Sequence, residues 1–174
     1  MIISVENLKN QINCGNTTDE QIAVKLDAIE AVIRAYTNNN FQQRGIRFSG
    51  YSDDFRVYGV PKNFSVGDTV QISSQWGVND GLYQVTVVSD DYIELDKTLV
   101  PVDTNLVTKI KYPADVIQCA VDLYKWKQNM GEKVGIKSET ISRHSVTYED
   151  SATLFMGYPV GILNGLNLYK KARC

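Results

Sequence analysis

The sequence predicts an α+β protein in which a small bundle of about four helices carries an inserted, small antiparallel β-barrel or sandwich. Helical periodicity dominates both ends of the chain, at 18–37 and from 113 onward, whereas short alternating patterns fill the middle. The helical stripes on the two sides of the β segment need each other to bury their apolar faces. We therefore expect a discontinuous helical domain, at 1–50 and 112–174, interrupted between its second and third main helices by a β domain at 51–111.

The best-marked helix begins at Thr18. Thr18 and Gln21 have the T-x-x-Q spacing of a capping box, in which two side chains satisfy free backbone N–H groups. Asparagine favours turns over helix interiors, so the asparagine run that follows Thr37 is expected to end this helix. A shorter helix is expected before it, over about 4–13. The apolar stripe of the longer helix recurs at steps of three and four, and it consists of Ile22, Leu26, Ile29, Ile33 and Tyr36.

Between 51 and 111 the strand patterns are short and the connections are rich in turn residues. Branched and aromatic residues alternate with polar ones in each pattern, and glycine and aspartate stand together between the patterns. About four or five short strands of this kind are typical of a small antiparallel barrel or sandwich, and the period alone does not choose between the two. The clearest strand patterns lie at 69–73, 82–87, 92–95 and 106–110.

The chain after the β segment is expected to form a helix, an arm and a second, short helix. Pro113 suits the first turn of a helix, where its missing N–H group is not needed. The residues from 137 to 150 are polar and strand-prone, which predicts an extended arm or hairpin. Tyr158 and Pro159 are expected to begin the terminal helix, which carries Ile162, Leu163, Leu166 and Tyr169 on one face.

Composition is that of a soluble globular protein, with 43% hydrophobic and 22% charged residues in a chain of 174. No apolar run approaches the roughly 20 residues of a membrane helix, so no membrane partner is expected. The N-terminus lacks a signal-peptide pattern, so we expect the protein to stay in the cytoplasm where it is made. A net charge of −2 gives no basic field for nucleic acid. The cysteines, Cys14, Cys119 and Cys174, are widely spaced, which predicts free thiols and no metal site.

The sequence contains no residue set suited to catalysis. The only histidine, His144, lies in the polar arm, where a solvated side chain is expected. No nucleophile elbow, P-loop or dinucleotide-binding glycine motif follows a predicted strand. Adjacent acidic residues such as Asp90 and Asp91 point apart in a strand and are expected to be solvated turn residues. We therefore expect a protein that is not an enzyme and that holds no cofactor and no metal.

Aromatic residues concentrate in the β segment. Most of them are expected to fill its small core, because lysine and arginine are not interleaved with them as in a nucleic-acid-binding face. Trp76, in a loop, is the best candidate for an exposed contact. The alternative is a glycan- or oligonucleotide-binding module, which needs a concave aromatic face and fails if the aromatics are buried. The residues concerned are Tyr51, Phe55, Tyr58, Phe64, Trp76, Tyr83 and Tyr92.

Short motifs follow one another in a set order from Tyr112 to the end of the chain. They are Y-P-A-D-V at 112–116, G-I-K-S-E-T-I at 135–141, S-V-T-Y at 145–148, G-Y-P at 157–159 and L-Y-K-K-A-R at 168–173. In this order and spacing they resemble the C-terminal half of the head–tail connector (adaptor) proteins of long-tailed, siphovirus-type bacteriophages. The helix that begins with T-D-E at 18–20 and ends near N-N-N-F also fits that pattern.

The resemblance implies a structural protein of the virion, made in the host cytoplasm. Such subunits form a dodecameric ring of neighbouring copies beneath the portal protein and present a surface to a tail-side stopper or tail-completion protein. DNA passes through the ring only as cargo. The family's shorter members lack so large a β segment, which leaves the role of 51–111 open. Another virion joint, a tail terminator or a stopper, is the alternative within the same class.

Two segments are expected to make the contacts of such a ring. An unpaired strand can add to the edge of a neighbour, so the arm is a candidate for oligomerisation through Ile141, Arg143, His144, Val146 and Tyr148; an ordinary hairpin on its own subunit is the alternative. Tyrosine and arginine are favoured at interfaces, and cations gather at the C-terminal end, where they also complement a helix dipole. The candidate for portal docking is therefore the terminal segment, through Tyr158, Tyr169, Lys170, Lys171 and Arg173.

Overall fold

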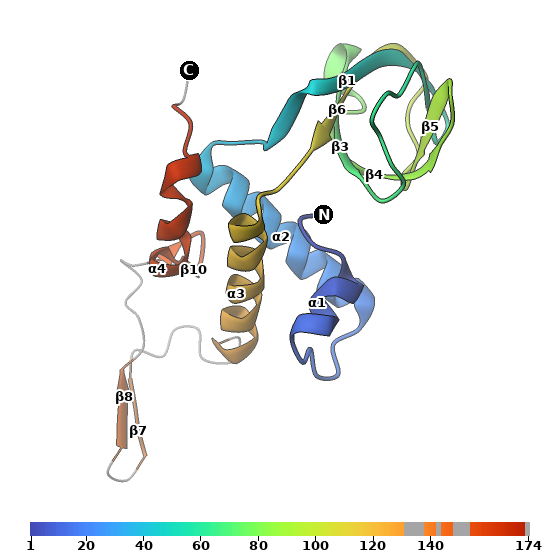
Figure 1. Cartoon of the computed structure of the whole chain (residues 1–174). Helices are drawn as coiled ribbons and strands as arrows, with labels where there is room; N and C mark the ends of the chain where they lie inside the picture. The colour runs from blue at the N-terminus through green and yellow to red at the C-terminus, as the bar shows by residue number, and fades with distance from the viewer. Residues whose placement is uncertain (131–137, 142–143, 148–153, 173–174) are drawn as a thin grey trace. The chain divides into compact units, whose positions relative to one another are not determined.

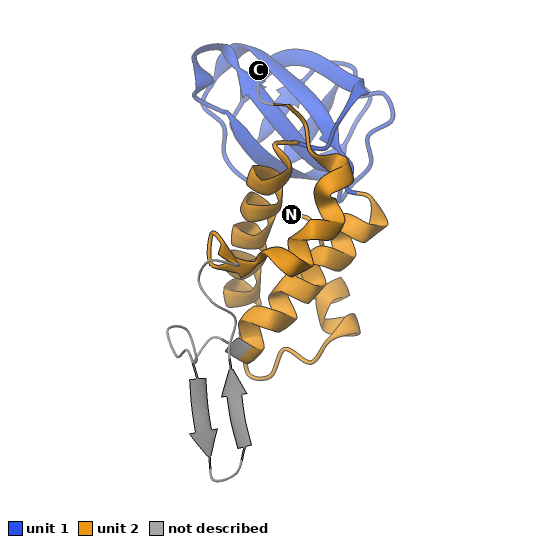
Figure 2. Ribbon diagram, turned by 90° about the vertical axis from the view of Figure 1, so that its left-hand side faces the viewer, with its two compact units in different colours: residues 1, 40–112 blue, residues 2–39, 113–174 orange. Residues whose placement is uncertain are grey.

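The computed structural model describes residues 1–130, 138–141, 144–147 and 154–172. The chain forms two compact units (Figure 2): a barrel unit of Met1 and Asn40–Tyr112, and a helical unit of Ile2–Asn39 and Pro113–Cys174. The α+β class is confirmed, and the β segment follows the second helix and precedes the third (Figure 1). The barrel unit begins at Asn40, so the predicted boundary at 51 lies inside its first strand.

The helical unit begins with α1 (Val5–Gln11) and α2 (Asp19–Thr37). The predicted capping box is present, because the Thr18 side chain accepts a hydrogen bond from the Gln21 N–H group and the Gln21 side chain accepts one from the Thr18 N–H group. Asn38 ends α2 in the left-handed conformation, at φ 48°, which asparagine tolerates better than most residues. Both signals for the ends of this helix are therefore local, and both were visible in the sequence.

The second half of the helical unit packs against the first. α3 (Ala114–Met130) lies beside α2 (Figure 1). The predicted terminal helix is one α-helical turn, α4 (Val160–Leu163), followed by the 3-10 segment η3 (Asn164–Tyr169). The predicted stripe of α2 is buried except for the half-buried Tyr36. The common core consists of Leu8, Ile22, Leu26, Ile29, Ile33, Val116, Ala120, Leu123, Tyr124, Leu163 and Leu166.

Two short sheets accompany these helices. β7 (Ser138–Ile141) pairs antiparallel with β8 (His144–Thr147), and β9 (Leu154–Phe155) pairs with β10 (Tyr158–Pro159). The predicted arm at 137–150 therefore contains a hairpin. Tyr158 and Pro159 belong to a strand, so α4 begins at Val160, two residues later than the sequence predicted.

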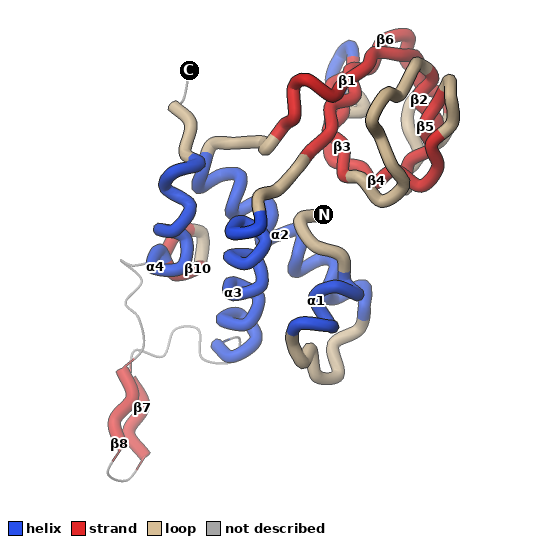
Figure 3. The backbone as a smooth tube through the Cα atoms, viewed as in Figure 1, coloured by secondary structure: helices blue, strands red, loops and turns tan. Residues whose placement is uncertain are grey.

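The barrel unit is a closed antiparallel barrel, which decides between the two β architectures that the sequence left open (Figure 3). Its strand order is β1-β2-β5-β4-β3-β6, and β1 and β6 close the ring. Closure pairs every edge strand and removes free edges from the sheet. The strands are β1 (Gln42–Asp53), β2 (Arg56–Tyr58), β3 (Thr69–Ser74), β4 (Gly81–Val88), β5 (Tyr92–Leu95) and β6 (Val102–Ile110).

β1 and β2 were missing from the sequence prediction. The burial of β1 alternates between exposed and half-buried residues over most of its length, so no strong apolar period marks it. Register shifts interrupt its pairing with β6 between Gln42 and Arg47 and between Gly50 and Ser52, which lets a long strand curve around the barrel. At Gly50 a Cβ atom would lie 1.5 Å from the carbonyl oxygen of Tyr58, so only glycine fits this crossing.

A polar network lies inside the barrel beside its aliphatic core. The Asn79 amide group donates to the hydroxyl of Ser52 (3.2 Å), the carbonyl of Val100 (2.8 Å) and the amide oxygen of Asn105 (3.1 Å), and its own oxygen accepts from the Val100 N–H group (2.8 Å). Asn79 and Asn105 are buried. A fully satisfied buried network of this kind joins segments that are distant in sequence. The core is aliphatic apart from one phenylalanine, and it consists of Val57, Phe64, Val70, Ile72, Val85, Ile93, Leu95, Leu99 and Val107.

Candidate interaction surfaces

The C-terminal segment, 164–172, is held against the end of α2 by asparagine side chains. The Asn39 amide donates to the carbonyl of Tyr169 (3.1 Å), and the Asn38 amide donates to the carbonyls of Lys171 (3.2 Å) and Ala172 (3.1 Å). The Lys171 N–H group donates to the carbonyl of Thr37 (2.9 Å). The residues that end α2 therefore also fix the path of the segment that the sequence assigned to docking.

The four described docking candidates differ in their exposure. Tyr158 is only 8% exposed, because its ring packs against Trp126 (6.0 Å between centroids) and below the Lys127 ammonium group (5.7 Å). This burial raises the pKa of the Tyr158 hydroxyl. Tyr158 is therefore part of the core and not the partner contact that the sequence predicted.

Tyr169, Lys170 and Lys171 lie together at the end of the described chain. The Tyr169 hydroxyl donates to both carboxylate oxygens of Asp115 (2.8 and 2.7 Å), and this bond to a carboxylate raises the pKa of Tyr169. Lys170 places its ammonium group 3.8 Å from the ring centroid of Tyr36. Both lysines are exposed, so they form a small basic surface; Arg173 lies outside the described residues.

The predicted oligomerisation arm is represented by the hairpin β7–β8. Ile141 pairs with His144, and Val146 pairs with Glu139. The two strands form a two-stranded sheet and pair with no other strand of the described chain. Arg143 and Tyr148 lie outside the described residues.

The aromatics of the barrel do not fill its core as predicted; of the seven, Phe64 alone is buried. The rings of Tyr51 and Tyr58 are stacked, with 4.5 Å between centroids and 7° between planes, and Tyr58 also contacts Tyr92. The Arg56 guanidinium lies 5.0 Å from the Tyr92 centroid. Aliphatic side chains and Phe64 form the core of this narrow barrel, and Tyr83 packs against it; Tyr51, Phe55 and Trp76 are exposed.

The prediction that Trp76 is exposed is confirmed, since 84% of its surface is accessible. Its backbone has φ 70°, a conformation that is strained for a residue with a large side chain. Asp80 holds the loop by accepting from the Ser74 N–H group (2.7 Å), and the Asn79 N–H group donates to the Ser74 hydroxyl (2.8 Å). The indole is therefore displayed from a loop that is anchored in the buried network.

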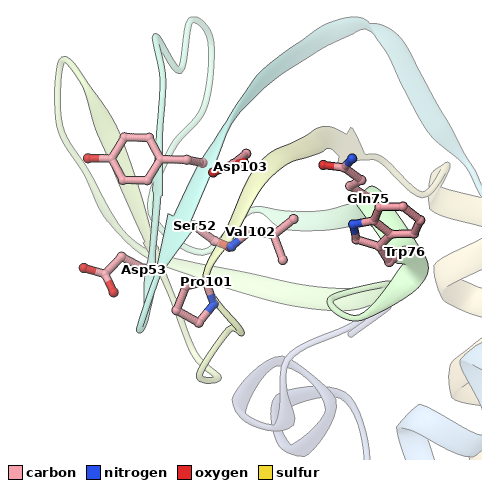
Figure 4. A pocket seen from close by; sticks show the side chains of 8 residues that line it. Ser52, Asp53, Gln75, Trp76, Pro101, Val102 and Asp103 are labelled. Carbon is pink, nitrogen blue, oxygen red and sulfur yellow. The ribbon is translucent and has the colours of Figure 1, made fainter.

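A pocket of about 410 Å³ lies beside Trp76, at the Ser52–Val102 end of the pairing between β1 and β6 (Figure 4). Figure 4 shows Gln75 and Trp76 on one side of the pocket and Asp53 on the other, with Pro101 and Val102 between them. The pocket thus combines exposed rings with carboxylates. Its lining residues are Tyr51, Ser52, Asp53, Gln75, Trp76, Pro101, Val102 and Asp103.

The described residues contain no group of three or more histidine, cysteine, aspartate or glutamate side chains placed to hold a metal ion. Cys119 is buried, and its thiol donates to the carbonyl of Ile162 (3.7 Å). Burial, together with Asp122 and Asp115, raises the pKa of this thiol to about 11, which keeps it protonated at neutral pH and unsuited to nucleophilic attack. Within the described ranges no helix has both the length and the apolar character that membrane crossing requires.

Sequence reasoning missed the second role of the asparagines after Thr37 and the carboxylates around Trp76. The asparagine run signalled a turn, but nothing local indicated that Asn38 and Asn39 bind a segment far along the chain. Asp103 lies near the start of a strand that pairs with β1, and β1 was itself not predicted. Neither a protein-family model nor a curated protein sequence matches this chain, so the resemblance to phage connectors stays a prediction.

Proposed function

We propose that this chain is a structural, non-enzymatic subunit of a phage head–tail connector, which assembles as a ring beneath the portal and joins the DNA-filled head to the tail. The observation that supports this most directly is the order of elements after the barrel. A helix, a self-paired hairpin and a basic terminal segment follow one another from Ala114 to Ala172. This is the order in which the resembling motifs occur.

The hairpin β7–β8 suits contact with neighbouring copies. Its two strands pair only with one another among the described strands, so each has a second edge that can accept a strand from a neighbour. Repeating that contact around a closed ring would join copies without any change in the helical core.

The basic surface of Lys170 and Lys171 suits docking to an acidic face of the portal. Both side chains are exposed, while the backbone that carries them is fixed by Thr37, Asn38 and Asn39. A fixed backbone lowers the entropy lost when the lysines engage a partner. The opposite side of the ring would then meet the tail-side stopper or tail-completion protein.

The experiment is to mix the purified protein with DNA-filled, tailless heads of its own phage and to image sedimented particles by cryo-electron microscopy. We expect a ring of extra density beneath the portal that contains both units. The variant K170E/K171E should leave the heads bare, whereas K62E, which reverses an exposed lysine of the barrel, should bind as the parent does. Heads that stay bare with the parent protein would rule out the connector role.

A second candidate, a binding module that uses the barrel, is favoured by the exposure of Tyr51 (51%) and Trp76 (84%). Such a module needs a concave aromatic face and fails if the rings are buried, and these two rings are exposed. The carboxylates of Asp53 and Asp103 beside the rings disfavour a nucleic-acid ligand, whose phosphates they would repel. Glycan-array binding by the isolated protein, together with bare heads in the first experiment, would favour this candidate.

A further inference from the structure

The pocket beside Trp76 is separate from the surfaces that the connector proposal uses. All of its lining residues belong to the barrel unit, whereas the hairpin and the basic segment belong to the helical unit. The ligand of this pocket is therefore a question beyond the proposed connector role, and the answer does not depend on that role.

Two exposed rings, those of Trp76 and Tyr51, line the pocket, and such rings can contact a flat or cationic group. Trp76 is exposed on a loop that Asp80 and Ser74 hold in a strained conformation. Tyr51 stacks on Tyr58 through one face of its ring and remains 51% exposed. The ring of Tyr51 is thus held by stacking, and the backbone that carries Trp76 is held by hydrogen bonds, which lowers the entropic cost of binding a partner side chain.

The charge of the pocket is one-sided. The eight lining residues include the carboxylates of Asp53 and Asp103 and no lysine or arginine. The pairing of β1 with β6 places these aspartates toward the Ser52–Val102 end of the ladder. The basic residues of the same two strands, Arg44, Arg47 and Lys109, lie toward the Gln42–Ile110 end. Arg56 of β2 is the cross-strand partner of Asp53, but its guanidinium group forms an ion pair with Glu94 (2.7 Å).

We propose that this pocket binds an arginine side chain presented by a segment of a partner protein. A guanidinium group stacks on aromatic faces and donates to carboxylates in a fork, so it matches both halves of the lining. The barrel already contains the same arrangement in miniature: Arg56 lies over the Tyr92 ring and forms an ion pair with Glu94 (2.7 Å). The volume of about 410 Å³ suits a single side chain with its flanking backbone.

The test uses tryptophan fluorescence in the full chain. The chain has two tryptophans, so the variant W126F leaves Trp76 as the only reporter excited at long wavelength. The probe is a blocked pentapeptide, Gly-Arg-Gly-Arg-Gly, and its control is the same peptide with citrulline, a neutral isostere, in place of arginine. We expect a saturable change in Trp76 emission with the arginine peptide and none with the citrulline peptide.

Charge-removal variants locate the site. In the W126F background, D53N/D103N should weaken the arginine peptide about tenfold, in keeping with two exposed ion pairs. D90N removes an exposed carboxylate of the β4–β5 turn, away from the pocket lining, and should bind as the parent does. Equal titration by the two peptides, equal weakening by D90N, or an emission change with neutral oligosaccharides alone would each overturn the proposal. Circular dichroism of each variant confirms that the fold is intact.

Discussion

In both units of this protein, asparagine side chains join segments that are distant in sequence, but the hydrogen bonds lie in the buried interior of one unit and nearer the surface of the other. In the barrel unit, the Asn79 amide joins Ser52, Val100 and Asn105 in the buried interior. In the helical unit, the amides of Asn38 and Asn39 bind backbone carbonyls of the C-terminal segment at the rim of the fold. A carboxamide can donate and accept at once, so it can join strands or segments that have no regular pairing. Because desolvation makes an unmet hydrogen bond costly, the buried Asn79 is expected to contribute more to stability than the exposed Asn38.

The units also differ in how the chain builds them. The barrel unit is, apart from Met1, one continuous segment, Asn40–Tyr112, whereas the helical unit combines Ile2–Asn39 with Pro113–Cys174. A continuous segment contains all the partners of its own core, and a divided one does not. The comparison predicts that the barrel is the independent folding unit and that the helical unit depends on both of its halves.

Excision gives the largest expected effect. Residues 40–112 alone should fold and unfold cooperatively, because all strand pairs of the closed barrel lie within them. Residues 113–174 alone should show little helix, since α3 would expose Val116, Leu123 and Tyr124, which are buried in the whole chain. Thermal unfolding followed by circular dichroism measures both. Cooperative unfolding of the fragment 113–174 on its own would contradict the comparison.

The variant N79A gives the next largest effect. It removes one donor group and one acceptor from a buried network and leaves the Val100 N–H group and the Asn105 amide oxygen without the partner that Asn79 provides. We expect a loss of about 3 kcal/mol in the free energy of unfolding of the barrel unit, measured by urea titration of Trp76 emission in the W126F background. S73A, on an exposed position of β3, is the matched control. A loss in N79A no greater than in S73A would show that the network contributes nothing to stability.

The sequence predicted the parts of the fold that rest on local signals. The capping box of α2, the turn at Asn38 and the strands near 82–87 and 92–95 all follow from neighbouring residues, and all are present. β1 was missed because its stability comes from pairing with β2 and β6, which follow it in the chain, and its burial pattern is weak. Asn79 lies in a turn between β3 and β4, but its buried partners are set by barrel closure, which no local pattern indicates. Aromatic residues in a β segment suggested a core, whereas the core of this barrel is aliphatic apart from Phe64.

The exposed asparagine should give a smaller, local effect. N38G keeps the left-handed backbone that ends α2 at φ 48° but loses the amide that binds the carbonyls of Lys171 and Ala172. We expect the thermal midpoint to change little and trypsin cleavage after Lys170 and Lys171 to rise roughly fivefold, which corresponds to about 1 kcal/mol of local opening. Mass spectrometry measures the cleavage, and N16G, at another exposed asparagine, is the control. Equal cleavage in the two variants would show that the Asn38 amide does not hold this segment.

The reactivity of the Cys119 thiol measures how firmly α4 is held, since this thiol donates a hydrogen bond to the carbonyl of Ile162. The folded pKa is about 11, above the ordinary value of 9.0. The unfolded chain therefore loses this proton first as the pH rises. The stabilisation that the protonated thiol provides is complete below pH 9 and is lost between pH 9 and pH 11. In the background C14A/C174S, which leaves Cys119 as the only thiol, iodoacetamide should label the folded protein slowly at pH 8 and faster as the pH approaches 11.

Combining this background with N38G tests whether the exposed asparagine acts only at the rim. If its two hydrogen bonds hold just the last residues, α4 stays against α3 and labelling of Cys119 at pH 8 is unchanged, while trypsin cleavage still rises. If labelling also accelerates, Asn38 holds the whole segment from Val160 onward. It would then stabilise contacts far from its own position, as Asn79 does, but with a smaller contribution to the free energy of unfolding. Labelling of the urea-unfolded chain gives the upper limit for the rate. The rim role is expected, because Leu163 and Leu166 are buried independently of the Asn38 amide.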